Sequence, residues 1–197
     1  MSIPESIAAA RDRIDSATSA CGRTDSVTLE LAVKTRTPEE CRAAATALAE
    51  ARLPILLGHN RVQEARATVD SPALAAKIDA RATGPFPVFV EVNVSGEATK
   101  HGCAPDDVAR LINTVEASAH LQLAGFMTVG LNSSVEADVR AAYAQLRDIR
   151  DEAAVRLSIE ESELALSMGM SQDLEWAIAE GATIVRLGTA IFGARRL

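Results

Sequence analysis

The sequence predicts an α/β fold in which parallel strands alternate with helices. Short apolar, β-branched segments recur along the 197 residues, and Ala-rich segments with helix-capping residues separate them. Because parallel strands need a crossover between them, this alternation is typical of a parallel sheet covered by helices. We count seven strands, whereas a closed TIM-type barrel has eight. An open doubly wound sheet needs fewer, but no GxGxxG follows the first strand, and periodicity alone does not decide.

Local signals place each element in order. Thr37 followed by Pro38 and two glutamates is a strong helix start, and Ser71 and Ser133 are expected to begin two later helices. A further helix should start near Arg61, after a loop at 58–60. Including these, helices are predicted at 3–20, 38–52, 71–81, 105–119 and 133–155. Strands are predicted at 26–33, 54–57, 68–70, 86–95, 121–127, 164–166 and 182–187.

Composition limits the classes of function. A formal net charge of -7 argues against a nucleic-acid-binding surface, which needs clustered Lys and Arg. No apolar run reaches the roughly 18 residues of a membrane span, and no signal peptide is recognisable, so a cytoplasmic protein is expected. Three scattered cysteines and three histidines without ligand spacing predict no metal site. The length fits a single domain over 1–197.

The stretch 164–195 predicts a phosphate site. It contains two strands, and each is followed by a loop of small residues that opens a helix, with Ser171 as the expected N-cap of the first. Backbone N–H groups and hydroxyls of two such loops can bind one phosphate, although ordinary strand-helix turns would look the same. The residues expected to hold it are Ser167, Met168, Gly169, Ser171, Gly188 and Thr189.

Two cations add to this pattern. Arg186 lies within an apolar strand and must find an acceptor there, which an ion pair would also supply. Lys34 ends the first strand, where an amine can attack a carbonyl and form a Schiff base, or can simply extend into solvent. A phosphorylated aldehyde fits both features, and pyridoxal 5′-phosphate (PLP) is such a compound. Arg186 would then face the pyridine nitrogen.

At these residues the chain resembles the pyridoxal phosphate homeostasis proteins, also called the YggS or PROSC family. The matching segments are LAVKTRTPEE (31–40), GHNRVQEA (58–65), VDSPALAAKIDAR (69–81), VFVEVNVSGEATKHGC (88–103), LAGFMTVG (123–130) and LSMGMSQDLEWAIAEGATIVRLGTAIFGAR (166–195). The resemblance implies an alanine-racemase-like (β/α)8 barrel of fold type III, with PLP on Lys34 and Asn60 beside the cofactor. It also implies a cytosolic, often monomeric PLP carrier without established turnover, for which apo PLP-dependent enzymes are candidate recipients.

The chain departs from the family at three places. Ala65 runs almost directly into Thr68, so a strand-helix unit of roughly 30 residues is absent there. We therefore expect an opened or rebuilt barrel, or residues of the molecule that this sequence omits. Val33 directly precedes Lys34 where the family usually has Ser or Thr, which can turn the lysine to the other face. His59 stands where the family commonly has Glu.

Three functions remain open from the sequence. The first is a PLP carrier, and the second is a PLP-dependent amino-acid racemase. Racemisation needs a second acid or base, and the sole tyrosine, Tyr143, lies in a predicted outer helix. The third is a PLP-free, phosphate-binding barrel enzyme that uses Lys34 on a sugar-phosphate carbonyl.

Overall fold

The computed structural model describes residues 1–34, 36–58 and 67–193. They form two compact units, one built from 1–60 and 169–197 and the other from 61–168. The single domain expected over 1–197 stays a prediction. The helix expected to begin near Arg61 lies outside the described residues.

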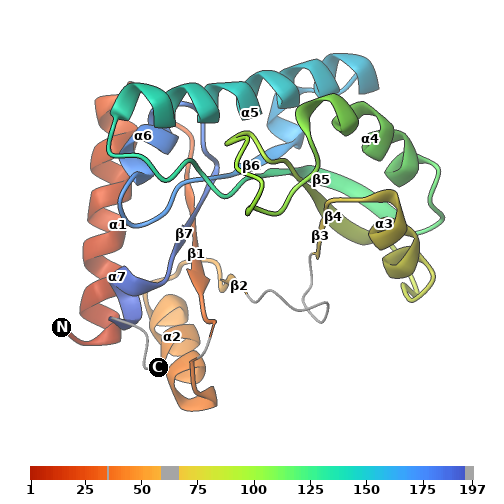
Figure 1. Ribbon diagram of the computed structural model, residues 1–197. Coiled ribbons are helices and arrows are strands. Elements are labelled where there is room, and N and C mark those ends of the chain that lie inside the picture. The colour runs from red at the N-terminus through yellow and green to blue at the C-terminus, as the bar shows by residue number, and fades with distance from the viewer. Residues whose placement is uncertain (35, 59–66, 194–197) are drawn as a thin grey trace. The chain divides into compact units, whose positions relative to one another are not determined.

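The strands of the first unit are parallel. In this unit β1 (Thr28–Ala32) pairs with β2 (Leu57–Gly58) on one side and with β7 (Ile184–Leu187) on the other. Figure 1 shows β1 and β7 side by side, although they come from opposite ends of the chain. Every β7 residue is buried, and the side chains of β1 alternate between buried and partly buried positions. These two strands therefore carry the core of the unit.

Four helices cover these strands: α1 (Ile3–Ala20), α2 (Pro38–Glu50), α6 (Leu174–Ala179) and the single turn α7 (Thr189–Phe192). The long helix α1 contacts the other three (Figure 1), and its Ile7 and Ile14 are buried. The predicted start of α2 is confirmed. Thr37 Oγ1 accepts from the N–H of Glu40, and the Glu40 carboxylate accepts from the N–H of Thr37.

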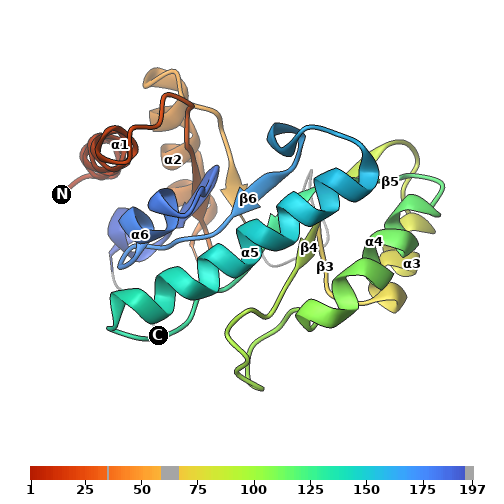
Figure 2. The ribbon, with the colours of Figure 1, turned by 90° about the horizontal axis from the view of Figure 1, so that it is seen from above.

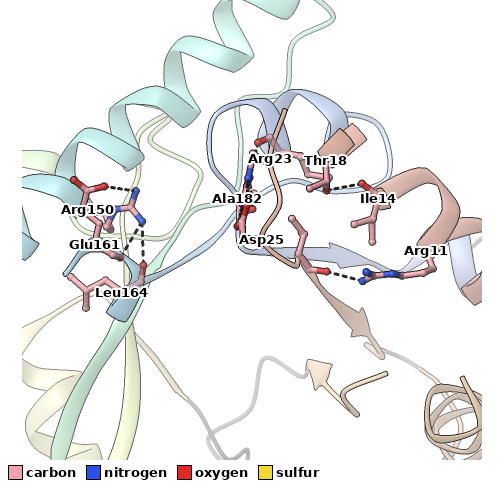
Figure 3. Close-up of polar contacts among 11 residues, drawn as sticks. Arg11, Ile14, Thr18, Arg23, Asp25, Arg150, Glu161, Leu164 and Ala182 are labelled. Atoms are coloured by element: carbon pink, nitrogen blue, oxygen red, sulfur yellow. Dashed lines mark hydrogen bonds and ion pairs between the residues drawn. The ribbon is translucent and has the colours of Figure 1, made fainter. Parts of the chain in front are cut away.

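Two arginines, one in the middle of α1 and one just after it, bind backbone carbonyls elsewhere in the first unit (Figure 3). Arg23 donates hydrogen bonds of 2.8 and 3.0 Å to the carbonyls of Ile178 and Ala182, where α6 ends, and pairs with Asp25. Arg11 donates to the Val27 carbonyl at 3.1 Å, just before β1. Carbonyls at a helix end lack intrahelical donors, so Arg23 supplies partners that α6 needs.

The second unit holds four parallel strands, namely β3 (Ala67–Val69), β4 (Phe86–Glu91), β5 (Leu121–Met127) and β6 (Ala165–Ser167), each paired with the next. Gly125 makes the β5–β6 pairing possible. Its φ is +148°, and a Cβ there would overlap the backbone of Ala165.

The helices of this unit are α3 (Pro72–Asp79), α4 (Val108–Glu116) and α5 (Glu136–Leu157), with short 3₁₀ turns at Pro105–Asp107 and Glu161–Glu163. Figure 2 shows α3 beside α4 and the long α5 crossing the unit. The buried Arg150 of α5 donates to the carbonyls of Glu161 and Leu164, at 3.2 and 3.5 Å (Figure 3). These bonds fix the start of β6 against α5. Tyr143 does lie in this helix, but its side chain is fully buried.

Seven strands occur among the described residues, and every pairing within a unit is parallel, which confirms the predicted α/β alternation. Several boundaries were wrong by two or more residues, and three of them illustrate why. The strand expected to reach residue 95 ends at Glu91, and Val92 adds only an isolated bridge. The helix expected from Ser133 begins at Glu136, because the Ser133 hydroxyl accepts from the N–H of Val135 in a preceding turn.

The third wrong boundary is that of the strand expected at 54–57, which the structure shows only as Leu57–Gly58. Pro54 has no N–H for a ladder. The strand-helix unit missing from this chain falls between β2 and β3, where residues 59–66 are outside the described part, so the rebuilt barrel stays a prediction. Within the described residues, no helix is long and apolar enough to cross a membrane.

Candidate functional site

Lys34 and the loop Gly188–Thr189 follow strands whose ends are in register. Leu31 of β1 is the partner of Leu187 in β7, and both strands run the same way. A Cβ placed on Gly188 would lie 3.3 Å from the Ala32 carbonyl oxygen. The first unit therefore brings the ends of β1 and β7 to one edge, which is where parallel α/β folds collect their binding groups.

Lys34 reaches the surface at this edge. Val33 is buried, with 1% exposure, and Lys34 is exposed. The N–H of Arg36 donates to the Val33 carbonyl at 3.1 Å and closes a turn directly after the strand. The missing Ser or Thr before the lysine therefore does not bury the amine.

The loop after β6 begins with buried residues. Ser167 and Met168, which belong to the second unit, are 4% and 0% exposed. In the first unit, Gly169 has φ +92°, and a Cβ on it would lie 2.5 Å from the Cβ of Ala177 in α6. Only glycine fits this turn without displacing α6.

Ser171 is not the N-cap of α6, so that expectation was wrong. The helix begins at Leu174 with Asp173 as its N-cap residue, and Asp173 Oδ1 accepts from the N–H of Met170 at 2.7 Å. The carboxylate thus closes the turn that precedes the helix and makes no capping hydrogen bond to α6 itself. Ser171 lies one turn earlier, partly exposed, and its carbonyl accepts from Arg13 at 2.8 Å.

Arg186 is buried in β7, with 8% exposure, as its position in an apolar strand predicted. Its backbone N–H donates to the Gly169 carbonyl at 3.0 Å, and its register partner on β1 is Glu30. An acidic residue of β1 is therefore the register partner of the buried arginine.

The second loop opens a single helical turn, as predicted. The N–H groups of Ile191 and Phe192 donate to the Gly188 carbonyl at 3.0 and 2.9 Å, and Gly193 ends the turn with φ +75°. Thr189 is exposed, and the N–H groups of the first two residues of the turn, Thr189 and Ala190, have no intrahelical acceptor. The Thr189 hydroxyl and these N–H groups can therefore bind an oxyanion.

Sequence reasoning missed two arginines that hold these loops in the first unit. Arg13 of α1 binds the Ser171 carbonyl and forms a paired ion contact with Glu175, in which Nη2 lies 2.6 Å from Oε2. Arg36 binds the carbonyls that end α7. Their partners are more than 150 positions away, so no local pattern marks them. Asn60 and His59 lie outside the described residues.

The chain is similar to known proteins. The sequence profile of the alanine racemase N-terminal domain matches residues 32–196. The pyridoxal phosphate homeostasis protein of Pseudomonas aeruginosa is 47% identical over 111 residues, or 56% of this chain and 46% of that protein. The one of Mus musculus is 36% identical over 135 residues, 65% of this chain and 49% of that protein. The chain thus spans about half the length of the curated relatives it matches.

Solved structures extend the likeness. An unknown protein from Bifidobacterium adolescentis has a TM-score of 0.83 at 32% identity, covering 96% of this chain and 94% of that one. PipY of Synechococcus elongatus, solved with PLP bound, has a TM-score of 0.73 at 26% identity. The match covers 97% of this chain and 100% of PipY. Alanine racemase from Corynebacterium glutamicum shares the fold, with a TM-score of 0.66 at 13% identity. The match covers 92% of this chain and 59% of the racemase.

These matches confirm the resemblance to the pyridoxal phosphate homeostasis proteins and the alanine-racemase-like fold predicted from the sequence. The profile covers far more than half of the chain. The chain therefore belongs to the alanine racemase N-terminal domain family.

Proposed function

We propose that this chain binds PLP and acts in PLP homeostasis, as a carrier without catalytic turnover. The observation that carries the proposal is the β1–β7 register, which sets Lys34 and Gly188–Thr189 at one edge of the first unit. Relatives named pyridoxal phosphate homeostasis proteins and the PLP-bound PipY structure support it.

The residues present fit the cofactor. The donor set combines an exposed primary amine, a buried guanidinium and two glycine-containing loops with hydroxyls, and these suit an aldehyde, a pyridine ring and a phosphate respectively. When bound, PLP supplies an aldehyde carbon that amines attack and a ring that withdraws electrons. In this proposal Lys34 Nζ holds that carbon. Gly169, Ser171, Gly188 and Thr189 hold the phosphate, whereas Ser167 and Met168, which belong to the second unit, stay phosphate ligands expected from the sequence alone.

Arg186 sets the character of the site in this proposal. A guanidinium keeps its proton at physiological pH, so at the pyridine nitrogen it donates a hydrogen bond and leaves that nitrogen unprotonated. An unprotonated ring stabilises a carbanion poorly. The arginine therefore favours storage of the cofactor over racemisation. Asn60 beside the cofactor is proposed from the sequence resemblance.

The racemase alternative lacks support for its second acid or base. Tyr143, the sole tyrosine, is fully buried within the second unit, where its hydroxyl lies close to Gly130. A group in that position cannot exchange a proton with a substrate. The PLP-free alternative is disfavoured by the names of the relatives. From the same resemblance we infer a monomer in the cytoplasm that delivers PLP to apo-enzymes.

Titration with PLP tests the proposal. We expect the wild-type protein to develop the absorbance band of lysine-bound PLP, with saturation at one equivalent, and Lys34→Ala to show free PLP only. Lys77→Ala, a change in helix α3, is the matched control and should bind like the wild type. A wild-type protein that never takes up PLP would refute the proposal. Racemase assays with alanine should give no turnover.

A further inference from the structure

Arg36 joins the turn after Lys34 to the end of α7. Its Nη1 donates to the Phe192 carbonyl at 3.3 Å, and its Nη2 donates to the Gly193 carbonyl at 2.9 Å. The guanidinium also lies over the Phe192 ring, 5.1 Å from the centroid. All of these groups belong to the first unit.

The contact is buried. The Arg36 side chain is 5% exposed, and its Nε has no hydrogen-bond partner among the described residues. Glu40 supplies a counter-charge, with Oε1 4.0 Å from Nη1. A guanidinium loses much hydration in such a place, so the two carbonyls and the aromatic face must replace the water. A lysine amine cannot reproduce the planar fork.

The geometry ties the two ends of the site together. On one side, the Arg36 N–H binds the Val33 carbonyl, so the residue is anchored two positions after Lys34. On the other side, α7 is one turn, whose final groups return to its start through Phe192 N–H to Gly188 O and Gly193 N–H to Thr189 O, both 2.9 Å. Fixing the end of so short a helix therefore also fixes Gly188 and Thr189.

We propose that Arg36 is a positioning residue, which holds the loop Gly188–Thr189 in place relative to Lys34 and so sets how tightly the phosphate of PLP is bound. This inference rests on the proposed function, because it assumes that the loop receives the phosphate. Arg36 itself need not touch the cofactor. Its effect should therefore depend on whether the ligand carries a phosphate.

Two ligands separate positioning from general stability. We would titrate PLP and pyridoxal, which lacks the phosphate, into the wild type, Arg36→Met and Arg36→Lys. Arg42→Met is the matched control, because Arg42 is an exposed α2 residue paired with Glu39. Loss of two charge-assisted hydrogen bonds predicts that Arg36→Met raises the Kd for PLP about tenfold or more. Its Kd for pyridoxal should stay within about twofold.

Arg36→Lys keeps the positive charge but loses the planar guanidinium whose two N–H groups bind the two carbonyls. Its Kd for PLP should therefore lie between those of the wild type and Arg36→Met. Arg42→Met should leave both constants unchanged. An equal loss for PLP and pyridoxal in Arg36→Met would show that Arg36 only stabilises the fold, and no loss for either ligand would equally overturn the proposal. Should Arg36→Met fail to fold, the PLP-to-pyridoxal comparison in Arg36→Lys decides in the same way.

Amide hydrogen exchange tests the contact between Arg36 and the end of α7 in the absence of PLP. The amides of Phe192 and Gly193 should exchange faster in Arg36→Met than in the wild type, while the amides of α1 keep their protection. If the wild type binds no PLP, the proposed function fails and the assigned role fails with it. If no amide of residues 188–193 exchanges faster in Arg36→Met than in the wild type, the positioning role is overturned, while the proposed function is not affected.

Discussion

The backbone N–H of Arg186 donates a 3.0 Å hydrogen bond to the carbonyl of Gly169. Gly169 begins the loop that leads into α6, and Arg186 lies two residues before Gly188. A main-chain bond therefore connects the first loop of the candidate phosphate site to the strand that leads into the second loop, whatever side chains they carry. Because this bond needs Gly169 in its left-handed turn, the glycine is the part of the frame most sensitive to substitution.

Replacing Gly169 by alanine should destabilise the protein. The new Cβ would meet the Cβ of Ala177 at 2.5 Å and would adopt φ +92°. Backbone strain and overpacking together predict a loss of about 2–4 kcal/mol in the free energy of unfolding, measured in urea. Gly22→Ala is the control, since its φ is +69° but nothing lies within 4 Å of the added atom. It should cost only about 1 kcal/mol. Equal losses of unfolding free energy in Gly169→Ala and Gly22→Ala would mean that α6 moves to accommodate the added Cβ at no extra cost.

Removing the Arg13 guanidinium should loosen the loop at Ser171. Arg13→Met loses the bond to the Ser171 carbonyl and the pair with Glu175. Both side chains of that pair are partly exposed, at 38% and 44%, so we expect a modest loss of about 1 kcal/mol at pH 7. Arg110→Met, which removes an exposed contact with Asp107, should change stability by less than about 0.5 kcal/mol.

The same pair predicts a pH dependence. The hydrogen bond from Arg13 lowers the pKa of Glu175 in the folded protein, against the opposing effect of burial. A carboxyl with a lowered folded pKa contributes stability above its unfolded pKa of about 4.3 and loses it as pH falls through the folded value. The difference in unfolding free energy between wild type and Arg13→Met should therefore shrink below about pH 4. A difference that is constant with pH would contradict this account.

Cys103 should resist alkylation in the folded protein. Burial, followed by the negative charge of Asp107, raises the pKa of its thiol to about 11. Little thiolate then exists at pH 8, whereas Cys21 is exposed to reagent. Mass spectrometry after brief iodoacetamide treatment should find Cys21 modified at least about tenfold faster than Cys103. In urea the two rates should converge, and similar rates in the native protein would contradict the burial of Cys103.

Capping patterns predicted only some of the element boundaries. Thr37 was correctly placed, because hydroxyl, proline and glutamate all favour the same start. Ser171 carries an equally good hydroxyl, but the helix begins after Asp173, whose carboxylate accepts from the N–H of Met170 and does not cap the helix. Where two candidate capping residues lie this close, the sequence does not decide between them, and tertiary contacts such as Arg13 on Ser171 do.

The candidate site was predictable where the chemistry is local. An amine at a strand end, an arginine in an apolar strand and two glycine-containing loops can be recognised along the chain. The arginines that hold those loops cannot, since Arg13 and Arg36 bind main-chain carbonyls more than 150 positions away. A carbonyl carries no sequence signal, so such contacts become visible only in the fold.

Reduction of the PLP-loaded protein with borohydride tests the central claim most directly. The chain has three lysines, at positions 34, 77 and 100, so peptide mass spectrometry can assign the trapped cofactor without ambiguity. The account predicts a phosphopyridoxyl group on the Lys34 peptide alone, at close to one per chain. A label on Lys77 or Lys100 instead, or bound PLP that leaves no label on Lys34, would contradict it.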